Sequence, residues 1–181
     1  MDNATVLNAL KTKFGDKILH DVEFRKQLIV WVAPDALVDI CTYLRDAPQF
    51  TYKFLSDVSA LDRLTMQQES FPDFDRQRFV VNYQLLSMAN KHRVWLKVSL
   101  PADNPTVASV ASVWATANFL EREVYDLMGI KFEGHPNLQR ILMPEDWEGH
   151  PLRKDYPVAY EEVQFSHNFD RIEKQKKYAK R

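Results

Sequence analysis

The stretch from Glu121 to Pro157 constrains the fold of this chain more than any other. It starts like a helix and continues as an irregular segment, EREVYDLMGIKFEGHPNLQRILMPEDWEGHPLRKDYP. Three of the four glycines and four of the nine prolines lie in it. Its large apolar side chains are Ile130, Phe132, Leu138, Ile141, Leu142, Trp147, Leu152 and Tyr156. Because the stretch has too many breaks to form its own core and too many apolar groups to stay in water, we expect it to bury itself against another surface.

Bulk properties exclude several classes of protein. The 181 residues fit one domain with an extension, and a net charge of −1 argues against a dedicated nucleic-acid binder. We find no membrane-length apolar run and no signal peptide, so we expect a cytosolic protein or one on the cytosolic side of a membrane. The single cysteine, Cys41, cannot form an internal disulfide or hold an iron–sulfur cluster alone. The four glycines form no GxGxxG or Walker loop.

Hydrophobic periodicity predicts the order α-β-α-β-β-β-α, at residues 3–14, 22–33, 35–46, 50–58, 79–85, 94–100 and 105–128. Asn3 and Asn104 are the expected N-caps of the first and last helices, and Gly129 ends the last helix. The polar segment 62–77 is expected to be a hairpin loop. We therefore predict an α+β fold with two parts. Residues 1–129 form a mixed four-stranded sheet with helices packed on it, and residues 130–181 form an extended, partner-binding arm with a basic tail.

Carboxylates on the last predicted helix need partners. Glu121 falls inside the apolar stripe, where an unpaired charge is costly, so it must find a partner or stay protonated. Arg122 and Asp126 are spaced to pair on the helix surface. For Glu121 and Glu123 the arm offers three cations: Arg140, Arg153 and Lys154. Our hypothesis is that the arm folds back and that its arginines clamp these helix carboxylates.

Two Gly-His-Pro tripeptides, Gly134-His135-Pro136 and Gly149-His150-Pro151, allow two interpretations. In the first, they are turns whose imidazoles bind carboxylate or backbone groups. In the second, the two histidines and nearby acids form the metal site of a free-standing hydrolase, although such ligands are usually closer in sequence. The acids Glu145, Asp146 and Glu148 could act as general acid and base, but an exposed acidic loop is far more common. Trp147 is the expected packing anchor.

The residues EREVYDLMGIKFEGHPNLQRIL and EDWEGHPLRKDYP closely resemble the thirty-kilodalton subunit family of respiratory complex I. The resemblance implies a structural, cofactor-free subunit in the peripheral arm of the proton-translocating NADH-quinone oxidoreductase, with no catalytic, cofactor-binding or metal-binding residue of its own. Its interface motif would comprise Glu121, Arg122, Glu123, Asp126, Gly129, Gly134, His135, Pro136, Arg140, Asp146, Trp147, Gly149, His150, Pro151, Arg153, Lys154, Asp155 and Tyr156.

The resemblance also implies partners. Such a subunit docks on the large forty-nine-kilodalton subunit, which helps to form the quinone cavity, and lies among iron–sulfur subunits. FMN, the iron–sulfur clusters and quinone are then held by partner subunits, on the cytoplasmic side of the inner membrane. Kindred subunits serve membrane-bound hydrogenases, the ferredoxin–plastoquinone complex and F420-dependent dehydrogenases, and these remain alternatives because the electron-input module lies in other chains.

Overall fold

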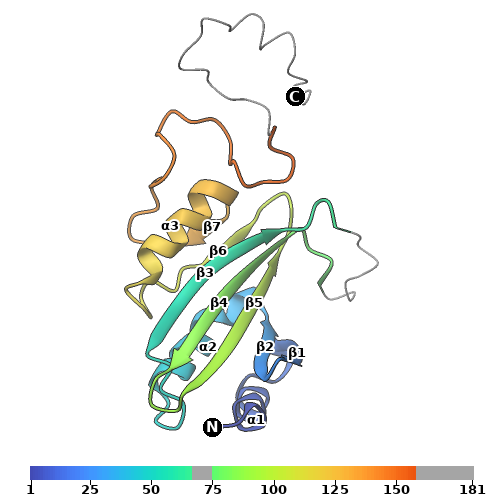
Figure 1. The fold of residues 1–181 in the computed structure, drawn as a ribbon, viewed down its shortest axis with the longest axis vertical. Helices are drawn as coiled ribbons and strands as arrows, with labels where there is room; N and C mark the ends of the chain where they lie inside the picture. Colours follow the sequence, from blue (N-terminus) through green and yellow to red (C-terminus); the bar gives the residue numbers. More distant parts are fainter. Residues whose placement is uncertain (67–74, 158–181) are drawn as a thin grey trace, which may run out of the picture.

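A mixed five-stranded sheet lies at the centre of the computed structural model, which describes residues 1–66 and 75–157 (Figure 1). The strands are β1 (Ile18–Phe24), β2 (Gln27–Val32), β3 (Phe54–Asp62), β4 (Phe79–Ser87) and β5 (His92–Leu100). Their order in the sheet is β1-β2-β5-β4-β3. Strand β2 is parallel to β5, and the other neighbours are antiparallel. A second sheet pairs β6 (Thr106–Ala108) with β7 (Lys131–Glu133) in parallel.

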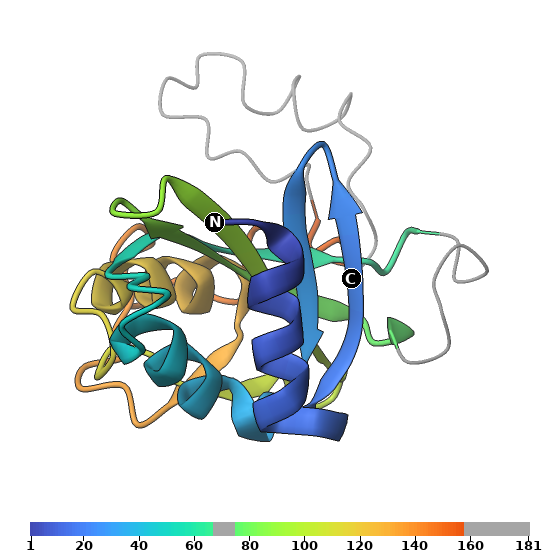
Figure 2. The same cartoon turned by 90° about the horizontal axis from the view of Figure 1, so that it is seen from below.

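The helices pack on the sheet around a single hydrophobic core (Figure 2). They are α1 (Asn3–Phe14), α2 (Leu37–Asp46) and α3 (Ala117–Met128), with short 3-10 turns η1 (Gly15–Lys17) and η2 (Pro34–Ala36). Along β5, Val94, Leu96 and Val98 are buried, whereas the residues between them are more exposed. Strand side chains alternate between faces, so one face of the sheet carries the core.

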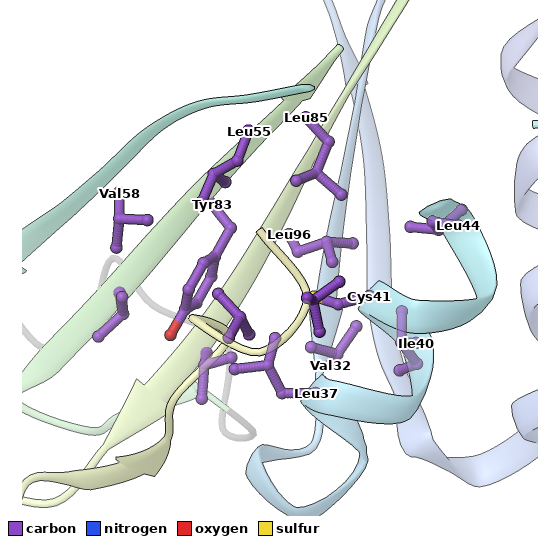
Figure 3. Close-up of a cluster of buried hydrophobic side chains, with 14 of the residues drawn as sticks. Val32, Leu37, Ile40, Cys41, Leu44, Leu55, Val58, Tyr83, Leu85 and Leu96 are labelled. Carbon is purple, nitrogen blue, oxygen red and sulfur yellow. The ribbon is translucent and has the colours of Figure 1, made fainter. Parts of the chain in front are cut away.

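The helix expected at residues 35–46 is present as η2 followed by α2, and one face of α2 is buried. Ile40, Cys41 and Leu44 are fully buried, and Figure 3 shows them facing strand side chains such as Leu96. Burial raises the pKa of the Cys41 thiol, which keeps it protonated. Cys41 is therefore a small core residue.

Two predictions near the N-terminus were wrong. The segment 22–33 is not one strand, because Arg25 and Lys26 adopt positive φ angles and turn the chain between β1 and β2. The sheet therefore has five strands instead of four. The N-cap of α1 is Asp2, whose carboxylate accepts from the Thr5 N–H, and not Asn3.

The last predicted helix was also too long. It begins at Ala117, because Thr106–Ala108 pairs as β6 with the chain that follows Gly129. Asn104 therefore caps no helix. Residues Val110, Val113 and Trp114 are buried, but in irregular backbone. Gly129 ends α3 as predicted, in the left-handed conformation with φ 71°.

The predicted α+β class is confirmed, with its mixed sheet and packed helices. Ile130 and Phe132, the first apolar residues after α3, belong to the core. Of the expected loop at 62–77, residues 67–74 lie outside the described residues, and the flanking β3 and β4 pair as a hairpin. The basic tail after Pro157 also lies outside them.

Candidate functional site

The C-terminal end of α3 is bound by the arm, which we define in the structure as residues 134–157. The last carbonyls of a helix have no hydrogen-bond donor within the helix. In α3 the carbonyls of residues 126 to 128 accept hydrogen bonds from residues of the arm. The His150 imidazole donates through Nδ1 to the Asp126 carbonyl at 2.9 Å. The Leu152 N–H donates to the Leu127 carbonyl at 3.0 Å. Arg153 donates to the Met128 carbonyl at 2.7 Å and to that of the next residue at 3.2 Å. The arm therefore completes the helix.

Asp126 holds the next part of the arm. Its side chain is fully buried, and one oxygen accepts from three consecutive backbone N–H groups, those of Ile141, Leu142 and Met143, at 2.7 to 3.0 Å. Its other oxygen accepts from Arg140 at 2.8 Å. Burial acts to raise the pKa of Asp126, but these hydrogen bonds outweigh it and lower the pKa to about 2. Asp126 is therefore ionised at neutral pH, and the arm turns around its carboxylate.

Arg140 extends this cluster further along the arm. The same guanidinium that binds Asp126 also donates to the carbonyls of Trp147 and Gly149, at 3.2 and 3.0 Å. The Arg140 guanidinium therefore connects Asp126 on α3 with two backbone carbonyls of the arm. A planar guanidinium suits this role because its five donors have fixed directions.

A second anchor ties the arm to the sheet. Arg78 forms a bidentate pair with the buried Asp62, at 3.0 and 2.8 Å, and also binds Asp155 at 2.9 Å. Asp62 accepts in addition from the Lys154 N–H at 2.9 Å. Burial acts to raise the pKa of Asp62, but the Arg78 and backbone hydrogen bonds outweigh it and lower the pKa to about 2. The end of the arm is thus fixed to β3 and to the residue before β4.

The expected arginine clamp on Glu121 and Glu123 was wrong. Glu121 is fully buried, but it accepts from the Ser109 hydroxyl at 2.5 Å and the Val110 N–H at 2.7 Å. Glu123 is exposed. The helix carboxylate that meets an arginine is Asp126. The predicted pair of Arg122 with Asp126 does not form either, because Arg122 donates to the carbonyls of Gln139 and Arg140.

Glu121 remains a proton-binding group at neutral pH. Burial raises its pKa from 4.5 to about 7, against the opposing effect of the hydrogen bonds from Ser109 and Val110. The His135 side chain, also fully buried, places Nε2 4.0 Å from the nearer Glu121 oxygen. The carboxyl thus stays protonated on the acid side of neutrality, which was one of the two outcomes expected from its place in the apolar stripe.

This raised pKa predicts a dependence of stability on pH. A group whose pKa is higher in the folded state stabilises fully below its unfolded pKa, near 4.5, and loses that contribution as pH rises through its folded pKa, near 7. The loss amounts to about 3 kcal/mol at most. Glu121→Gln mimics the protonated acid and cannot ionise. Between pH 5 and pH 8 the unfolding free energy of the wild type should therefore fall relative to that of Glu121→Gln. Urea denaturation at several pH values measures this, with Glu123→Gln as the exposed control. Parallel pH profiles for wild type and Glu121→Gln would contradict it.

The two Gly-His-Pro turns bind opposite ends of α3. His135 donates through Nε2 to the Asn118 carbonyl at 3.0 Å, and its Nδ1 accepts from the Asn137 N–H. His150 contacts Asp126, eight residues further along the helix, which corresponds to about 12 Å. Within residues 1–66 and 75–157, no group of three or more potential ligands could hold a metal ion. This geometry supports the turn interpretation over the metal-dependent hydrolase.

The other motif residues lie along the surface of the arm. Asp146, like its acidic neighbours Glu145 and Glu148, is exposed, as is Pro136; Trp147 and Pro151 are partly buried. Tyr156 packs over Gly149, where an added Cβ would lie 3.0 Å from its ring. Gly134 and Gly149 both have positive φ angles, as the turns require. The structure thus brings the motif together on and around α3, with its acidic loop in solvent.

Sequence reasoning missed three residues of this site. Asp62 was assigned to the expected loop at 62–77 and Arg78 follows it, and nothing in their local sequence indicates that they meet Lys154 and Asp155. Ser109 was assigned to a helix that does not exist there. Thr106 and Val107 are residue types that favour strands. This preference is the signal that could have placed Ser109 outside the helix, where it contacts Glu121.

The folded arm still leaves apolar side chains in solvent. Ile141, Leu142 and Leu152 are 36%, 57% and 55% exposed. The backbone around them is fixed by Asp126 and by the end of α3. The fold and the site therefore define a class of protein: a small α+β scaffold whose folded arm keeps large apolar side chains exposed on its surface.

Comparisons with known proteins identify the family. Residues 30–162 match the model of the family "Respiratory-chain NADH dehydrogenase, 30 Kd subunit". A subunit of the NADH-quinone oxidoreductase of Roseiflexus sp. (strain RS-1) is 47% identical over 180 residues, 99% of this chain and 98% of that protein. Its counterpart in Geobacter sulfurreducens is 46% identical over 157 residues, covering 87% and 91% of the two chains. The chain belongs to the 30 kDa subunit family of the respiratory-chain NADH dehydrogenase.

Solved structures agree with this assignment. A trypsin-resistant fragment of Nqo5 is 31% identical, with a TM-score of 0.62, and covers 76% of this chain and 100% of the fragment. A chain of an archaeal membrane-bound sulfane sulfur reductase is 19% identical, with a TM-score of 0.67 and 85% coverage of both chains. The second likeness shows a shared fold. None of the helices in the described ranges is long and apolar enough to cross a membrane.

Proposed function

We propose that this chain is a structural subunit of the proton-translocating NADH-quinone oxidoreductase, and that its arm docks on the large forty-nine-kilodalton subunit beside the quinone site. The observation that carries the proposal is the arm itself. The arm is fixed to α3 by the Arg140–Asp126 ion pair, and to the sheet by the Lys154 N–H bond to Asp62 and the Arg78–Asp155 ion pair. Its side chains Ile141, Leu142 and Leu152 nevertheless stay in solvent. A preorganised apolar surface loses little conformational entropy when it binds a partner.

The proposal assigns no cofactor to the chain. The buried carboxylates Asp62 and Asp126 are both bound to arginines, and the two histidines of the arm hold helix carbonyls. These four side chains therefore form hydrogen bonds and ion pairs that stabilise the fold. FMN, the iron–sulfur clusters and quinone belong to partner subunits under this proposal, and the chain works from the cytoplasmic side of the inner membrane. Its contribution to electron transfer is geometric, since rigid docking fixes the distances between centres on its neighbours.

Removing the exposed apolar groups of the arm tests the proposal. The double variant Leu142→Ser, Leu152→Ser should fold normally, because both side chains are more than half exposed. It should bind its partners at least about tenfold more weakly, since two lost apolar contacts at an interface are worth about 2 kcal/mol or more together. The measurement is recovery of the forty-nine-kilodalton and iron–sulfur subunits on the tagged chain, with quinone reduction by the membranes as a second readout.

The matched control lies on β1, at a distance from the arm. Leu19 and Val22 are 43% and 38% exposed, so replacing Leu19 by serine and Val22 by threonine removes apolar surface away from the arm. This control should co-purify with its partners as the wild type does. Normal recovery of partners with the arm variant would overturn the proposed docking surface.

A further inference from the structure

A basic groove lies at the end of the sheet farthest from the arm. It has a volume of about 520 Å³ and is lined by Lys26, Gln27, Leu86, Met88, Lys91, His92 and Arg93. Three of these side chains are cationic and none is acidic. Figure 1 places the N-terminus and the β4–β5 turn at one end of the molecule and the described part of the arm at the other. The groove is therefore separate from the surface assigned above to the large subunit.

Two turns with positive φ angles supply two of the three groove cations, Lys26 and Lys91, and the third, Arg93, lies at the start of β5. Arg25 and Lys26 turn β1 into β2 with φ angles of 50° and 66°, and Lys91 precedes β5 with φ 49°. Glycine and asparagine adopt such angles most easily, and they dominate tight turns of this kind. Three of the four non-glycine residues with positive φ in the described chain are thus cations at one end of the sheet. Positions that break a local rule in this way commonly serve a function.

Asn3 joins the two turns into one structure. Its side-chain amide donates to the Lys26 carbonyl at 3.3 Å, and its oxygen accepts from His92 Nε2 at 2.9 Å. The other His92 nitrogen lies 2.6 Å from the Tyr52 hydroxyl. Figure 2 shows the N-terminus between the two turns. His92 is consequently a fixed part of the groove wall, and the backbone of the turn that carries Lys26 is tied to it through Asn3.

We propose that this groove binds an acidic segment of a neighbouring polypeptide. The three cations supply the complementary charge, and Leu86 with the 72% exposed Met88 supplies apolar contact for side chains between the acids. A small anion would make no use of that apolar surface. The nearby carboxylate of Asp2 is already used by the N-cap of α1. The inference adds a second contact to the proposed structural role, since a protein with docking surfaces at both ends bridges two neighbours.

Binding of a defined acidic probe tests the groove on the full chain. A fluorescein-labelled peptide of three Glu-Glu-Leu repeats should raise the fluorescence anisotropy on binding, with an affinity that falls as salt increases. The groove variant Lys26→Gln, Lys91→Gln, Arg93→Gln keeps the long side chains and removes the charges. It should bind the peptide at least about fivefold more weakly. Amide chemical shifts of the wild type should move at Lys26 and Lys91.

The control variant removes as many positive charges elsewhere. Lys11, Lys53 and Lys131 are exposed and lie outside the groove, so their change to glutamine should leave peptide binding within twofold of the wild type. Equal loss in both variants would overturn the proposal, because the attraction would then be a general charge effect. Stronger binding of phosphatidylserine vesicles or inorganic phosphate at the same amides would overturn the ligand class. The variant Leu142→Ser, Leu152→Ser should bind the peptide normally, which separates this test from that of the arm.

Discussion

Asp126→Asn is expected to detach the arm from α3 and to destabilise the protein by about 3 kcal/mol. The carboxylate accepts from three backbone N–H groups through one oxygen and from Arg140 through the other. An asparagine has the same size but only one acceptor oxygen. Whichever way its amide is oriented, its NH₂ group faces either the backbone donors or the guanidinium. Donors then face donors inside a buried site.

The loss should be visible in two measurements. Urea denaturation should show the lower unfolding free energy, and limited proteolysis should cut the variant within residues 134–157, where the wild type resists. Glu123→Gln is the control, since this exposed residue lies on the same helix and leaves the Asp126 contacts intact. Unchanged stability and protease resistance in Asp126→Asn would show that Asp126 does not hold the arm.

Gly129→Ala is expected to have an effect of similar size, about 3 to 4 kcal/mol, for a steric reason. The residue has φ 71°, and an added Cβ would lie 2.5 Å from His150 Nε2 and 2.5 Å from an Arg153 guanidinium nitrogen. The left-handed conformation alone costs an alanine roughly 1–2 kcal/mol. Displacing His150 and Arg153 additionally removes their hydrogen bonds to the end of α3. Thermal unfolding should show the loss as a lower Tm.

Gly134→Ala is the matched control for Gly129→Ala. Gly134 has φ 77°, but nothing lies within 4 Å of the Cβ position. It therefore has the conformational cost without the collision. The expected order of Tm, from highest to lowest, is wild type, then Gly134→Ala, then Gly129→Ala. Equal Tm values for the two variants would show that contact with the arm contributes nothing at Gly129.

Elements with a clear period were predictable from sequence, whereas their ends often were not. The hairpin of β4 and β5 and the stripe of α2 follow directly from alternation and from helical spacing. The turn at Arg25 and Lys26 was missed because it carries cations where sequence rules expect glycine or asparagine. The start of α3 was missed because β6 forms only through pairing with β7, after the helix. Pairing between distant segments has no local signal.

The site shows the same division. The composition of the arm predicted that it packs against another surface, and the charged residues of the motif predicted that the arm folds back on α3. The choice of partners depended on tertiary geometry: Glu121 faces Ser109, while Asp126 faces Arg140. Both carboxylates lie on one short helix, so their local sequence could not decide which of them meets an arginine. The contact of Asp62 with Arg78 and Lys154 joins residues up to 92 positions apart.

The donors that complete α3 lie 24 to 25 residues after the carbonyls they satisfy. During synthesis, the last turn of α3 therefore cannot form these hydrogen bonds until residues 150 to 153 have been made. A product truncated before His150 would keep a frayed helix and would also lack the ordered arm that we propose as the docking surface. Integrity of the chain and competence for assembly thus depend on the same few hydrogen bonds, so that incomplete copies are poorly suited to enter the complex.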